Sequence, residues 1–435
     1  FPIVALPAYL ILGDRKFSGY VDARRSGDAP LQQLAREIDE RLPVELHAEF
    51  GAGESAHGVL TRLARLPFFG GNCSRLLING EATFGAIFDS IDEATDYVLL
   101  QFYIVRNDTL GRQLRRRLIE ASNRGVRVYF LYDRVGSNSL NDSYLRPLLE
   151  AGVEIVVFRG SSRGAGHLFR VNFRNHRKIV VVDGHTAFVG GHNVGDEYVG
   201  NSPEPSLRPW RDTHVEVCGP AVLGIQLAFV EDWYWMTGQI PAIRTRPVAA
   251  EGANQRILVL PSGPADTLDT CGLLFTELIH SARQRLWIVS PYFIPDEQLM
   301  SALQLAALRG VDVRVLIPQN PDHLHVYLSG ISYLEEAKKA GVKVYRYQPG
   351  FLHQKVFLID DHVAGIGTAN LDNRSMRLNF EVTMLLLDQD FASEVEKMLI
   401  ADFDRSELAS VTEYTERWLP FRFLVRTSRL FAPVQ

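Results

Sequence analysis

An internal repeat constrains the fold of this chain more than any other feature of its sequence. Each of two stretches, 173–193 and 351–370, places a Lys two residues after a His, an Asp seven after it, a Gly fourteen after it and an Asn seventeen after it. The repeated residues are His176, Lys178, Asp183, Gly190 and Asn193 in the first stretch, and His353, Lys355, Asp360, Gly367 and Asn370 in the second. A match at all five positions is not expected by chance, so the chain is predicted to contain two copies of one unit.

The similarity between the copies extends over whole supersecondary units. "YVLLQFYIVRND" (97–108) matches "LWIVSPYFIPDE" (286–297). In each half a helix then runs through Arg-Gly-Val into an apolar strand, at 118–133 and at 303–318. Each half reads β-α-β-α-β-β, and its strands are apolar throughout, as in sheets that are buried on both faces. The repeat therefore predicts an α/β protein made of two similar halves that pack together.

A length of 435 residues agrees with two halves, because one hydrophobic core seldom serves so long a chain. Apolar residues at helical spacing predict a helix after each motif, at 220–236 and 391–406. An additional loop at 161–172, present only in the first half, is expected to shape access to its strand end. The expected domains are a membrane-anchor remnant (1–13), a connecting segment (14–75), the first half (76–250), the second half (251–412, joined near 246–255) and a C-terminal tail (413–435).

The first thirteen residues, "FPIVALPAYLILG", carry no charge. As a helix they would extend over about 20 Å, against about 30 Å of bilayer hydrocarbon. Two interpretations stay open: a short buried helix or a disordered end on the one hand, and a truncated transmembrane helix on the other. The second is favoured because nothing resembling a signal cleavage site follows. Arg15, Lys16, Arg24 and Arg25 would then place the body of the chain on the cytoplasmic side, where it is soluble or rests on the membrane surface.

Charge and cysteine usage narrow the function classes further. A formal net charge of −5 disfavours nucleic-acid binding, which usually needs a basic excess. The three cysteines, Cys73, Cys218 and Cys271, lack the spacing of a metal site. An odd, scattered set is interpreted as reduced thiols in a core, which suggests a reducing compartment. Since neither metal-ligand spacing nor a nucleotide-binding loop is found, no metal and no cofactor are expected.

The repeated motif carries side chains that suit phosphate chemistry. In a strand, residues two apart point to the same side, so each His shares a face with its Lys. If a pseudo-two-fold axis brings the two faces together, one pocket receives two imidazoles, two ammonium groups and two Asn amides. Lys and Asn donors suit the oxygens of a phosphate, and two histidines supply a nucleophile and a general acid/base. Lysines can also neutralise developing charge without a metal ion.

The pattern H-x-K-x4-D followed by G-x2-N, in two copies, resembles the phospholipase D superfamily. "RNHRKIVVVDG", "WRDTHVEV", "SPYFIPDEQL" and "GTANLDNRSMRLNFEV" are similar to the bacterial cardiolipin synthases of that superfamily. The resemblance covers residues 76–412 and implies two pseudo-symmetric phospholipase D-like α-β-α sandwich halves. It also implies phospholipid substrates, no cofactor, and a chain held at the bacterial inner membrane with its catalytic body on the cytoplasmic side.

The activity implied by the resemblance is a two-step transfer that converts two phosphatidylglycerol molecules into cardiolipin and glycerol. His176 would attack phosphorus and form a phosphatidyl-histidine while His353 protonates the departing glycerol. His353 would then deprotonate a hydroxyl of the second lipid, whose attack releases cardiolipin. The near-symmetry of the two motifs leaves open which histidine attacks first.

The same resemblance assigns roles to the other matched residues. The residues expected to hold the phosphate are Lys178, Lys355, Asn193 and Asn370. Asp212 and Glu381 occupy the positions of the acids that orient the imidazoles in this superfamily. Asp183 and Asp360 belong to the catalytic motif but are expected to brace the turn after each strand.

Other functions stay open at this point. A hydrolytic phospholipase D would use the same pocket, with water resolving the intermediate. A nuclease is disfavoured by the net charge and the apolar start, and a non-catalytic lipid-binding protein by the two intact motifs. Arg174 and Arg177 either contact a second anionic headgroup or form surface ion pairs. His192, His323 and His325 either line the pocket or lie in solvated loops.

Overall fold

The computed structural model describes most of the chain and places both repeated motifs. The described residues are 29–41, 43, 46, 55–159, 173–410 and 417–432. The expected membrane-anchor remnant (1–13) and the additional loop (161–172) lie outside these ranges. Within them, no helix combines the length and the apolar character that crossing a bilayer requires.

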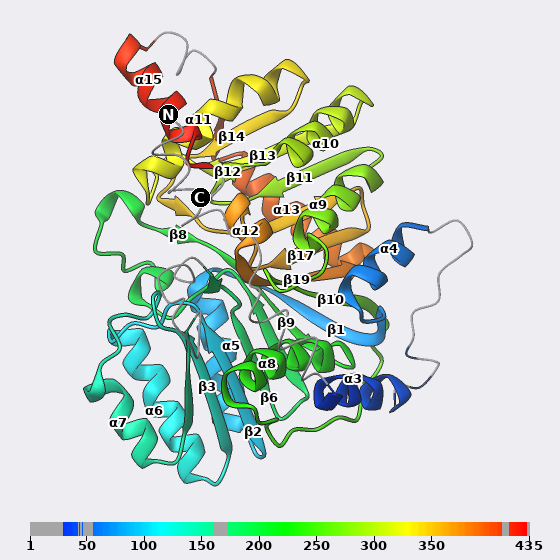
Figure 1. Cartoon of the computed structure of the whole chain (residues 1–435), viewed down its shortest axis with the longest axis vertical. Helices are drawn as coiled ribbons and strands as arrows, with labels where there is room; N and C mark the ends of the chain where they lie inside the picture. Colours follow the sequence, from blue (N-terminus) through cyan, green and yellow to red (C-terminus); the bar gives the residue numbers. More distant parts are fainter. Residues whose placement is uncertain are drawn as a thin grey trace.

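Two similar halves share one sheet, and β1 and β10 lie side by side between them (Figure 1). The strands of the first half are β1 (Phe69–Ile78), β2 (Tyr97–Phe102), β3 (Arg127–Asp133), β4 (Glu154–Phe158), β6 (Ile179–Val182), β7 (Thr186–Gly190) and β9 (Thr213–Cys218). Those of the second half are β10 (Gln255–Ser262), β11 (Arg285–Val289), β13 (Asp312–Pro318), β14 (Lys343–Tyr347), β16 (Val356–Ile359), β17 (Val363–Gly367) and β19 (Asn379–Leu387), with β20 (Ser406–Leu408) at its edge.

The strand order is a mirror image about the β1–β10 pair. From one edge it runs β4-β3-β2-β6-β7-β9-β1, and from the other, after β20, it runs β14-β13-β11-β16-β17-β19-β10. In each half three strands are parallel (β2-β3-β4 and β11-β13-β14), and the others pair antiparallel. The predicted pair of similar α/β halves is therefore confirmed.

Helices cover both faces of the sheet in each half. Those of the first half are α5 (Asn79–Glu93), α6 (Thr109–Asn123), α7 (Asp142–Glu150), α8 (Ala221–Thr237) and the 3₁₀ turns η3 (Asp196–Val199) and η4 (Pro205–Leu207). Those of the second half are α9 (Thr270–Ser281), α10 (Glu297–Leu308), α11 (Leu324–Lys339), α12 (Asn373–Arg377) and α13 (Gln389–Phe403). Outside the repeat lie α3 (Ala29–Arg41), α4 (Ser55–Ala64) and α15 (Leu419–Arg429). The helices α8 and α13 are the ones predicted after the two motifs.

The alternation of side chains along β2 shows why the strands are apolar throughout. Tyr97 and Leu99 belong to the same hydrophobic cluster as the residues of α8, whereas Val98 and Leu100 belong to the cluster that contains α5 and α6. Successive residues of a strand point to opposite faces, so both sets must be apolar. This α-β-α layering is the one that the resemblance implied.

Short strand pairings connect the halves next to the two motifs. β5 (Arg174–Asn175) of the first half pairs with β19 of the second, and β15 (Phe351–Leu352) of the second pairs with β8 (Trp210–Arg211) of the first. Both pairings are parallel. A further short pair, β12 (Phe293–Ile294) with β18 (Leu371–Asp372), lies within the second half. The chain therefore crosses from one half to the other immediately before each repeated histidine.

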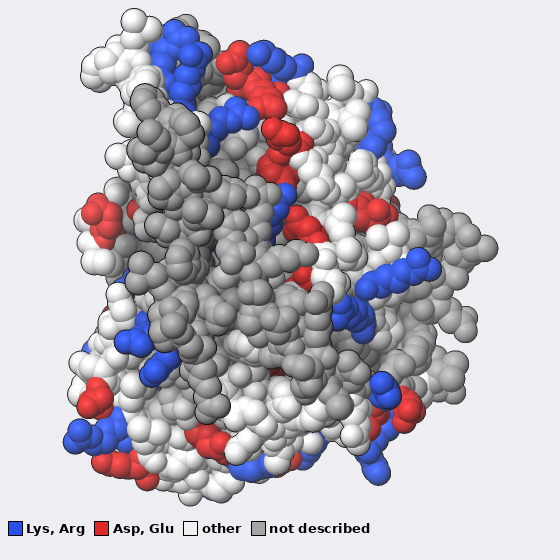
Figure 2. All heavy atoms as spheres, in the orientation of Figure 1, with Lys and Arg blue, Asp and Glu red and all other residues white. Residues whose placement is uncertain are grey.

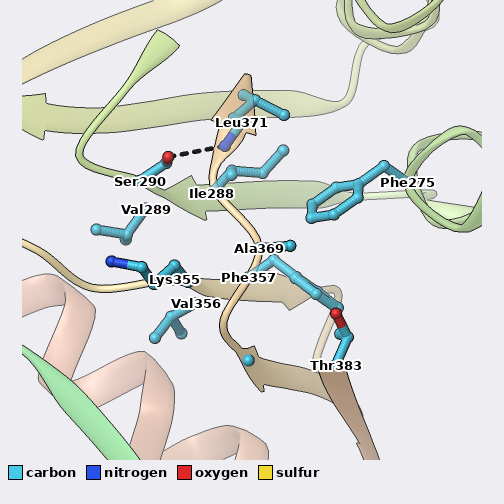
Figure 3. A pocket seen from close by; sticks show the side chains of 11 residues that line it. Phe275, Ile288, Val289, Ser290, Lys355, Val356, Phe357, Ala369, Leu371 and Thr383 are labelled. Carbon is cyan, nitrogen blue, oxygen red and sulfur yellow. Dashed lines mark hydrogen bonds between the residues drawn. The ribbon is translucent and has the colours of Figure 1, made fainter. Parts of the chain in front are cut away.

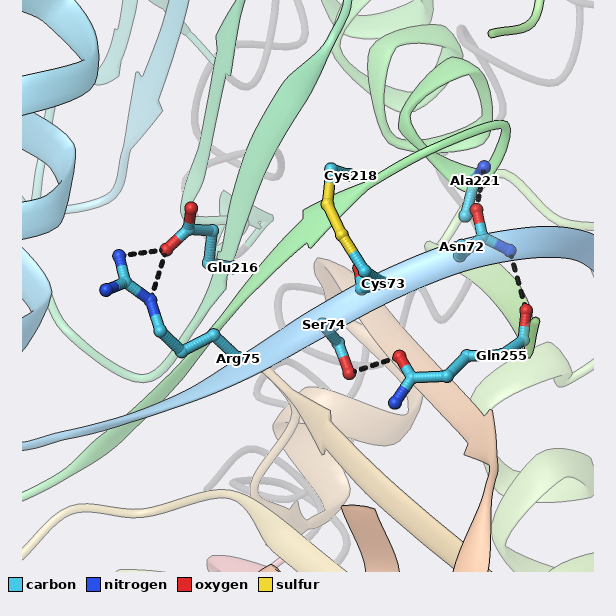
Figure 4. Close-up of a disulfide and its surroundings, with 8 residues drawn as sticks. All are labelled: Asn72, Cys73, Ser74, Arg75, Glu216, Cys218, Ala221 and Gln255. Carbon is cyan, nitrogen blue, oxygen red and sulfur yellow. Dashed lines mark hydrogen bonds and ion pairs between the residues drawn. A yellow bond between two sulfur atoms is a disulfide. The ribbon is translucent and has the colours of Figure 1, made fainter. Parts of the chain in front are cut away.

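The interpretation of all three cysteines as reduced thiols is wrong for two of them. Cys73 on β1 lies directly opposite Cys218 on β9, with 5.2 Å between their Cα atoms, and the two form a disulfide (Figure 4). Such a Cα separation suits a disulfide. The two residues are 145 positions apart, so only the strand pairing brings them together. Cys271 is a free, buried thiol, as expected.

Candidate active site

His176 follows β5, where the first half contacts β19. Its backbone N–H donates to the carbonyl of Phe380 at 2.9 Å. Its Nδ1 lies 3.0 Å from both carboxylate oxygens of Glu381 and 3.1 Å from the carbonyl oxygen of Thr368. All of these atoms accept hydrogen bonds, so Nδ1 carries the proton and Nε2 remains for chemistry. The Thr368 hydroxyl and the Asn379 amide also donate to Glu381, which fixes its carboxylate.

His353 occupies the equivalent position after β15. Its backbone N–H donates to the carbonyl of Arg211 at 2.8 Å, and its Nδ1 lies 2.7 Å from Oδ2 of Asp212. The other carboxylate oxygen, Oδ1, accepts from the backbone N–H of Thr213 at 2.8 Å. A Cβ added to Gly191 would lie 2.0 Å from that Oδ1. A residue without a side chain is therefore needed behind Asp212.

Each histidine pairs with the acid of the opposite half. Glu381 of the second half holds His176, and Asp212 of the first half holds His353. The parallel pairings β5–β19 and β8–β15 produce this exchange, because β19 contains Glu381 and Asp212 immediately follows β8. The structure therefore brings both histidines and both acids of the expected site together, in crossed pairs.

The two lysines lie buried beside their histidines. Lys178 Nζ donates to the backbone carbonyl of His176 at 2.6 Å, and Lys355 Nζ donates in the same way to His353. Burial, the largest cause, lowers the pKa of Lys178 to about 7 and that of Lys355 to about 8, and the charge of Lys355 lowers the pKa of Lys178 as well. At this proximity an arriving anion would restore the full charge of both.

A small cavity lies beneath Lys355 (Figure 3). Phe275, Phe357 and Leu371 are among the apolar residues that line the cavity. Lys355 is also part of the lining, and its amine points away from Phe275. Its volume is about 10 Å³, no more than one water molecule needs. Ser290, also in the lining, accepts a hydrogen bond from the backbone N–H of Leu371. The stem of Lys355 is thus held by close packing, which also explains its desolvation.

Burial keeps both imidazoles neutral near pH 7. It is the largest cause that lowers the pKa of His176 to about 4, and it lowers the pKa of His353 well below its usual value. Lys355, Lys178 and His176 lower the pKa of His353 further, so these groups lie within electrostatic reach of one another. Burial opposes the charge of Glu381, but His176 and Lys178 outweigh it and keep the pKa of Glu381 low. The site therefore holds a neutral imidazole beside an ionised carboxylate.

The two repeated asparagines are buried next to this centre. Asn193 Oδ1 accepts from the backbone N–H of Ile104 at 3.0 Å, and its Nδ2 donates to the hydroxyl of Tyr198 at 2.7 Å. The backbone N–H of Asn370 donates to the hydroxyl oxygen of Ser375 at 3.0 Å. The side-chain Oδ1 of Asn370 has no hydrogen-bond partner among the described residues. An Nδ2 has two hydrogens, so Asn193 retains one donor for a ligand.

The motif acids lie at the other ends of the strands. Asp183 and Asp360 follow β6 and β16, five residues beyond each lysine and about 16 Å along the strand. Asp183 accepts from the backbone N–H of Thr95 at 2.8 Å, and Asp360 from that of Gln284 at 2.7 Å. Both have positive φ, 54° and 51°. The structure does not bring them to the histidines and places them at the turns, where their carboxylates bind the start of a neighbouring strand.

Arg177 matches neither of its two open interpretations, and His192 does not lie in a solvated loop. Arg177 is buried, and its guanidinium donates to Asp232 at 2.9 Å and to the backbone carbonyl of Glu381 at 3.0 Å. It therefore ties α8 to β19 rather than facing a headgroup or solvent. His192 is also buried, and its Nδ1 lies 3.1 Å from Nδ1 of His214.

Aromatic residues that the motifs did not indicate surround the two imidazoles. Tyr103 packs edge-on against His176 with 5.1 Å between ring centroids. Trp210 and Tyr198 lie 5.3 and 5.7 Å from the ring of His353. Tyr103 could have been found from the repeat, because the matching stretch of the second half has a tyrosine at the same position. Trp210 and Tyr198 have no such counterpart.

Comparison with known proteins gives consistent results. A family model described as "Cardiolipin synthase, PLD-like domain" matches residues 87–205 and 275–403. Cardiolipin synthase A of Pseudomonas putida (strain W619) is 48% identical over 435 residues, which is 100% of this chain and 90% of that protein. Cardiolipin synthase A of Pseudomonas aeruginosa (strain LESB58) is 49% identical over 439 residues, covering 100% of this chain and 88% of that protein.

Solved structures with lower identity share the fold. A phosphatidylserine synthase of Haemophilus influenzae Rd KW20 aligns with a TM-score of 0.63 at 14% identity, over 88% of this chain and 100% of that one. A polyphosphate kinase of Porphyromonas gingivalis aligns with a TM-score of 0.54 at 13% identity, over 82% of this chain and 53% of that one.

Proposed function

Because the chain belongs to the cardiolipin synthase family with phospholipase D-like domains, we propose that it forms cardiolipin by phosphatidyl transfer between two phosphatidylglycerol molecules. The observation that carries this proposal is the pair of buried histidines, each bound through Nδ1 to a carboxylate of the opposite half and flanked by a buried lysine. This arrangement supplies a nucleophile, a proton donor and a cationic phosphate site in one place.

In the first step, Nε2 of His176 attacks the phosphorus of one phosphatidylglycerol. The P–N bond forms while the P–O bond to the glycerol headgroup breaks, which gives a phosphatidyl-histidine and frees glycerol. His176 is neutral at pH 7 because its pKa is about 4, so its lone pair is available. As the imidazole gains positive charge, the carboxylate of Glu381 at 3.0 Å stabilises it.

His353 protonates the departing glycerol oxygen. Its low pKa in the empty site leaves it neutral, but a bound phosphate adds negative charge nearby and favours the imidazolium. In the second step the neutral His353 takes the proton from a hydroxyl of the second phosphatidylglycerol. That oxygen attacks phosphorus, the P–N bond breaks, and cardiolipin leaves with His176 restored.

The phosphate oxygens would be held by Lys178, Lys355, Asn193 and Asn370. The lysines donate to the histidine backbones and are oriented by them, so their ammonium groups are placed before the substrate arrives. One phosphodiester is exchanged for another, so the reaction needs no nucleotide. Asp183 and Asp360 would act indirectly, by holding the turns at the far ends of the motif strands.

Cardiolipin and phosphatidylglycerol are bilayer lipids, so the chain acts at a membrane. We place its body on the cytoplasmic side of the bacterial inner membrane, on the basis of Arg15, Lys16, Arg24 and Arg25. The disulfide Cys73–Cys218 points the other way, since such bonds persist in oxidising compartments. Thiol labelling of intact cells decides between the two. If Cys73 and Cys218 are labelled without a reductant in permeabilised cells but not in intact cells, they are free thiols behind the membrane, and the cytoplasmic side is supported.

The transfer is tested with purified chain and phosphatidylglycerol vesicles, with lipid products read by mass spectrometry. Cardiolipin together with free glycerol is expected. His176→Ala and His353→Ala should abolish both products, whereas the exposed His362→Ala serves as a matched control with normal turnover. Phosphatidic acid as the sole product would show a hydrolase instead. Full turnover in either motif variant would disprove the two-histidine mechanism.

A further inference from the structure

The C-terminal helix α15 lies outside the two halves and packs on α11. Val425 of α15 is fully buried against Leu328 and Ile331 of α11. The hydroxyl of Ser329 donates to the carbonyl of Ser428 at 2.9 Å. One face of α15 is therefore already covered by the body of the protein.

The opposite face of α15 is apolar and exposed. Leu419 is 75% exposed, Phe423 is 73% exposed and Leu430, just after the last helical residue, is 77% exposed. Their spacing of four and then seven residues places them on one side of a helix. Trp418, which is 69% exposed, is the residue immediately before the first turn of α15. Trp418, Leu419, Phe423 and Leu430 together are called the α15 outer face.

An amphipathic helix normally turns its apolar stripe toward a core. Here Val425 already contacts the core, so the α15 outer face is a second apolar stripe that the body leaves uncovered. Large apolar side chains grouped at one surface mark an interaction site. Any partner must therefore accept a rod about three turns long with large aliphatic and aromatic side chains.

Arginines accompany this apolar stripe. The basic residues of the segment are Arg417, Arg422, Arg426 and Arg429, and the described part of it, 417–432, contains no acidic residue. Figure 2 shows blue side chains beside white surface at the corner where Figure 1 places α15. Arg429 pairs with Glu336 of α11 at 3.0 Å. Arg426, three residues after Phe423 and four before Leu430, projects from the same side as the apolar stripe. A helix that combines large apolar side chains with arginines complements an apolar layer under negative headgroups.

The start of α15 lies beside residues 322–327, the edge of the second half that approaches Lys355 and is called the active-site edge. Phe421 and Tyr327 border the same small cluster, so the start of α15 lies beside the start of α11. The residue that begins α11, Leu324, is 66% exposed. Shortly before it, Asp322 accepts a hydrogen bond from the hydroxyl of Tyr292 at 2.7 Å and lies within electrostatic reach of Lys355.

We propose that the α15 outer face docks on an anionic phospholipid bilayer, with α15 lying in the plane of the interface. Leu419, Phe423 and Trp418 enter the acyl region, while the arginines remain at the headgroup level. This contact goes beyond the phosphatidyl transfer itself, because it holds the active-site edge against the layer from which lipid substrates come. A second copy of the chain is the competing occupant of the same surface.

The test uses the full chain with phosphatidylglycerol vesicles that contain lipids brominated in the acyl chain. Bromine quenches tryptophan fluorescence at short range, so Trp418 should be quenched. Trp418→Phe should lose most of the quenching, because the other tryptophans lie within or close to the body. Equal quenching in the wild type and in Trp418→Phe would overturn the proposal.

A second pair of variants measures affinity. The double variant Leu419→Asn/Phe423→Asn should bind anionic vesicles about tenfold more weakly or worse, because the transfer of two large apolar side chains from water into the acyl region is lost. Leu308→Asn, at an exposed leucine of α10, is the matched control and should bind normally. Unchanged vesicle binding of the double variant, with loss of a self-associated form, would assign the surface to a second copy instead.

The proposed transfer is followed separately with short-chain phosphatidylglycerol dissolved as monomers. The double variant should turn this soluble substrate over at the wild-type rate. If the wild type itself fails on the soluble substrate, the assignment of the reaction is at fault. The double variant should be slower than the wild type on vesicles; if it turns over both the soluble and the vesicle substrate at the wild-type rate, the docking surface is at fault.

Discussion

Replacing the two acids by amides should have unequal effects, because their surroundings differ. In Asp212→Asn, the backbone N–H of Thr213 keeps a carbonyl oxygen at the Oδ1 position. The amide nitrogen then faces Nδ1 of His353 in place of Oδ2, which lies 2.7 Å from it. Since that nitrogen can only donate, His353 must move its proton to Nε2, where it can no longer accept one from the substrate.

Glu381→Gln should leave the tautomer of His176 unchanged. Nδ1 of His176 also lies 3.1 Å from the carbonyl oxygen of Thr368, which accepts its proton whatever the side chain at 381. The hydroxyl of Thr368 can rotate to accept from the new amide. The variant therefore loses only the charge of the carboxylate.

The magnitudes follow from these two situations. A hydrogen bond to a charged group contributes about 1–2 kcal/mol more than a neutral one, which is about a fivefold to thirtyfold change in rate for Glu381→Gln. Asp212→Asn adds the wrong tautomer, and the same change in a Ser-His-Asp triad lowers kcat about 10⁴-fold. We therefore expect Asp212→Asn to be slower than Glu381→Gln by at least about 300-fold.

Cardiolipin formation from phosphatidylglycerol, followed by mass spectrometry, provides the rates. Asp92→Asn, which alters a partly exposed ion pair with Arg117, serves as the control for an acid-to-amide change. Thermal unfolding of each variant shows whether it is folded. Equal losses in the two active-site variants, or a greater loss in Glu381→Gln, would refute the assignment of tautomers from the hydrogen bonds.

Three further predictions concern stability. Burial lowers the pKa of His192 and His214 from 6.5 to about 3, so as the pH falls the unfolded chain takes up protons at these two groups before the folded chain does. The folded state should therefore lose stability between pH 6.5 and pH 3, by up to about 1.4 kcal/mol per pH unit for each group. A urea midpoint that rises between about pH 7 and pH 5 would contradict this. Asp232→Asn should lower the free energy of unfolding by about 3–5 kcal/mol, because it leaves the buried Arg177 without its carboxylate. Asp92→Asn, in a partly exposed ion pair, should change the free energy of unfolding by no more than about 1 kcal/mol, and denaturant titration compares the two variants. A reductant should lower the melting temperature of the wild type, because loss of a native disulfide costs about 2–5 kcal/mol. It should leave the melting temperature of Cys73→Ser unchanged. If the reductant lowers both melting temperatures equally, the disulfide does not contribute to stability.

The arrangement of the halves could be predicted where strands are buried on both faces. The runs Ile179–Val182 and Val356–Ile359 are buried throughout, and their apolar character is visible in the sequence. β1 has no such signal in the sequence, because in "FGGNCSRLLI" the first Phe is followed by five small or polar residues. Its pairing with β10 also has an irregular register. The first half was therefore expected to start at 76, although β1 begins at Phe69.

The positions of the histidines, lysines and acids could also be found from the sequence, but the pairing of acid with histidine could not. That pairing depends on β5, β8 and β15, each two residues long. So short a strand has no periodicity to detect, and its partner lies in the other half. The disulfide was missed for the same physical reason, since Cys73 and Cys218 meet only through long-range strand pairing.

The exchange of acids between the halves has a consequence for specialisation. In a symmetric dimer of two identical half-length chains, both histidines would necessarily have the same neighbours. Fusion into one chain removes that requirement, and here one imidazole has a glutamate with a backbone carbonyl while the other has an aspartate alone. A substitution near one histidine can therefore adjust that imidazole without altering its twin. Joining the copies thus allows one histidine to be refined as a nucleophile and the other as a proton carrier.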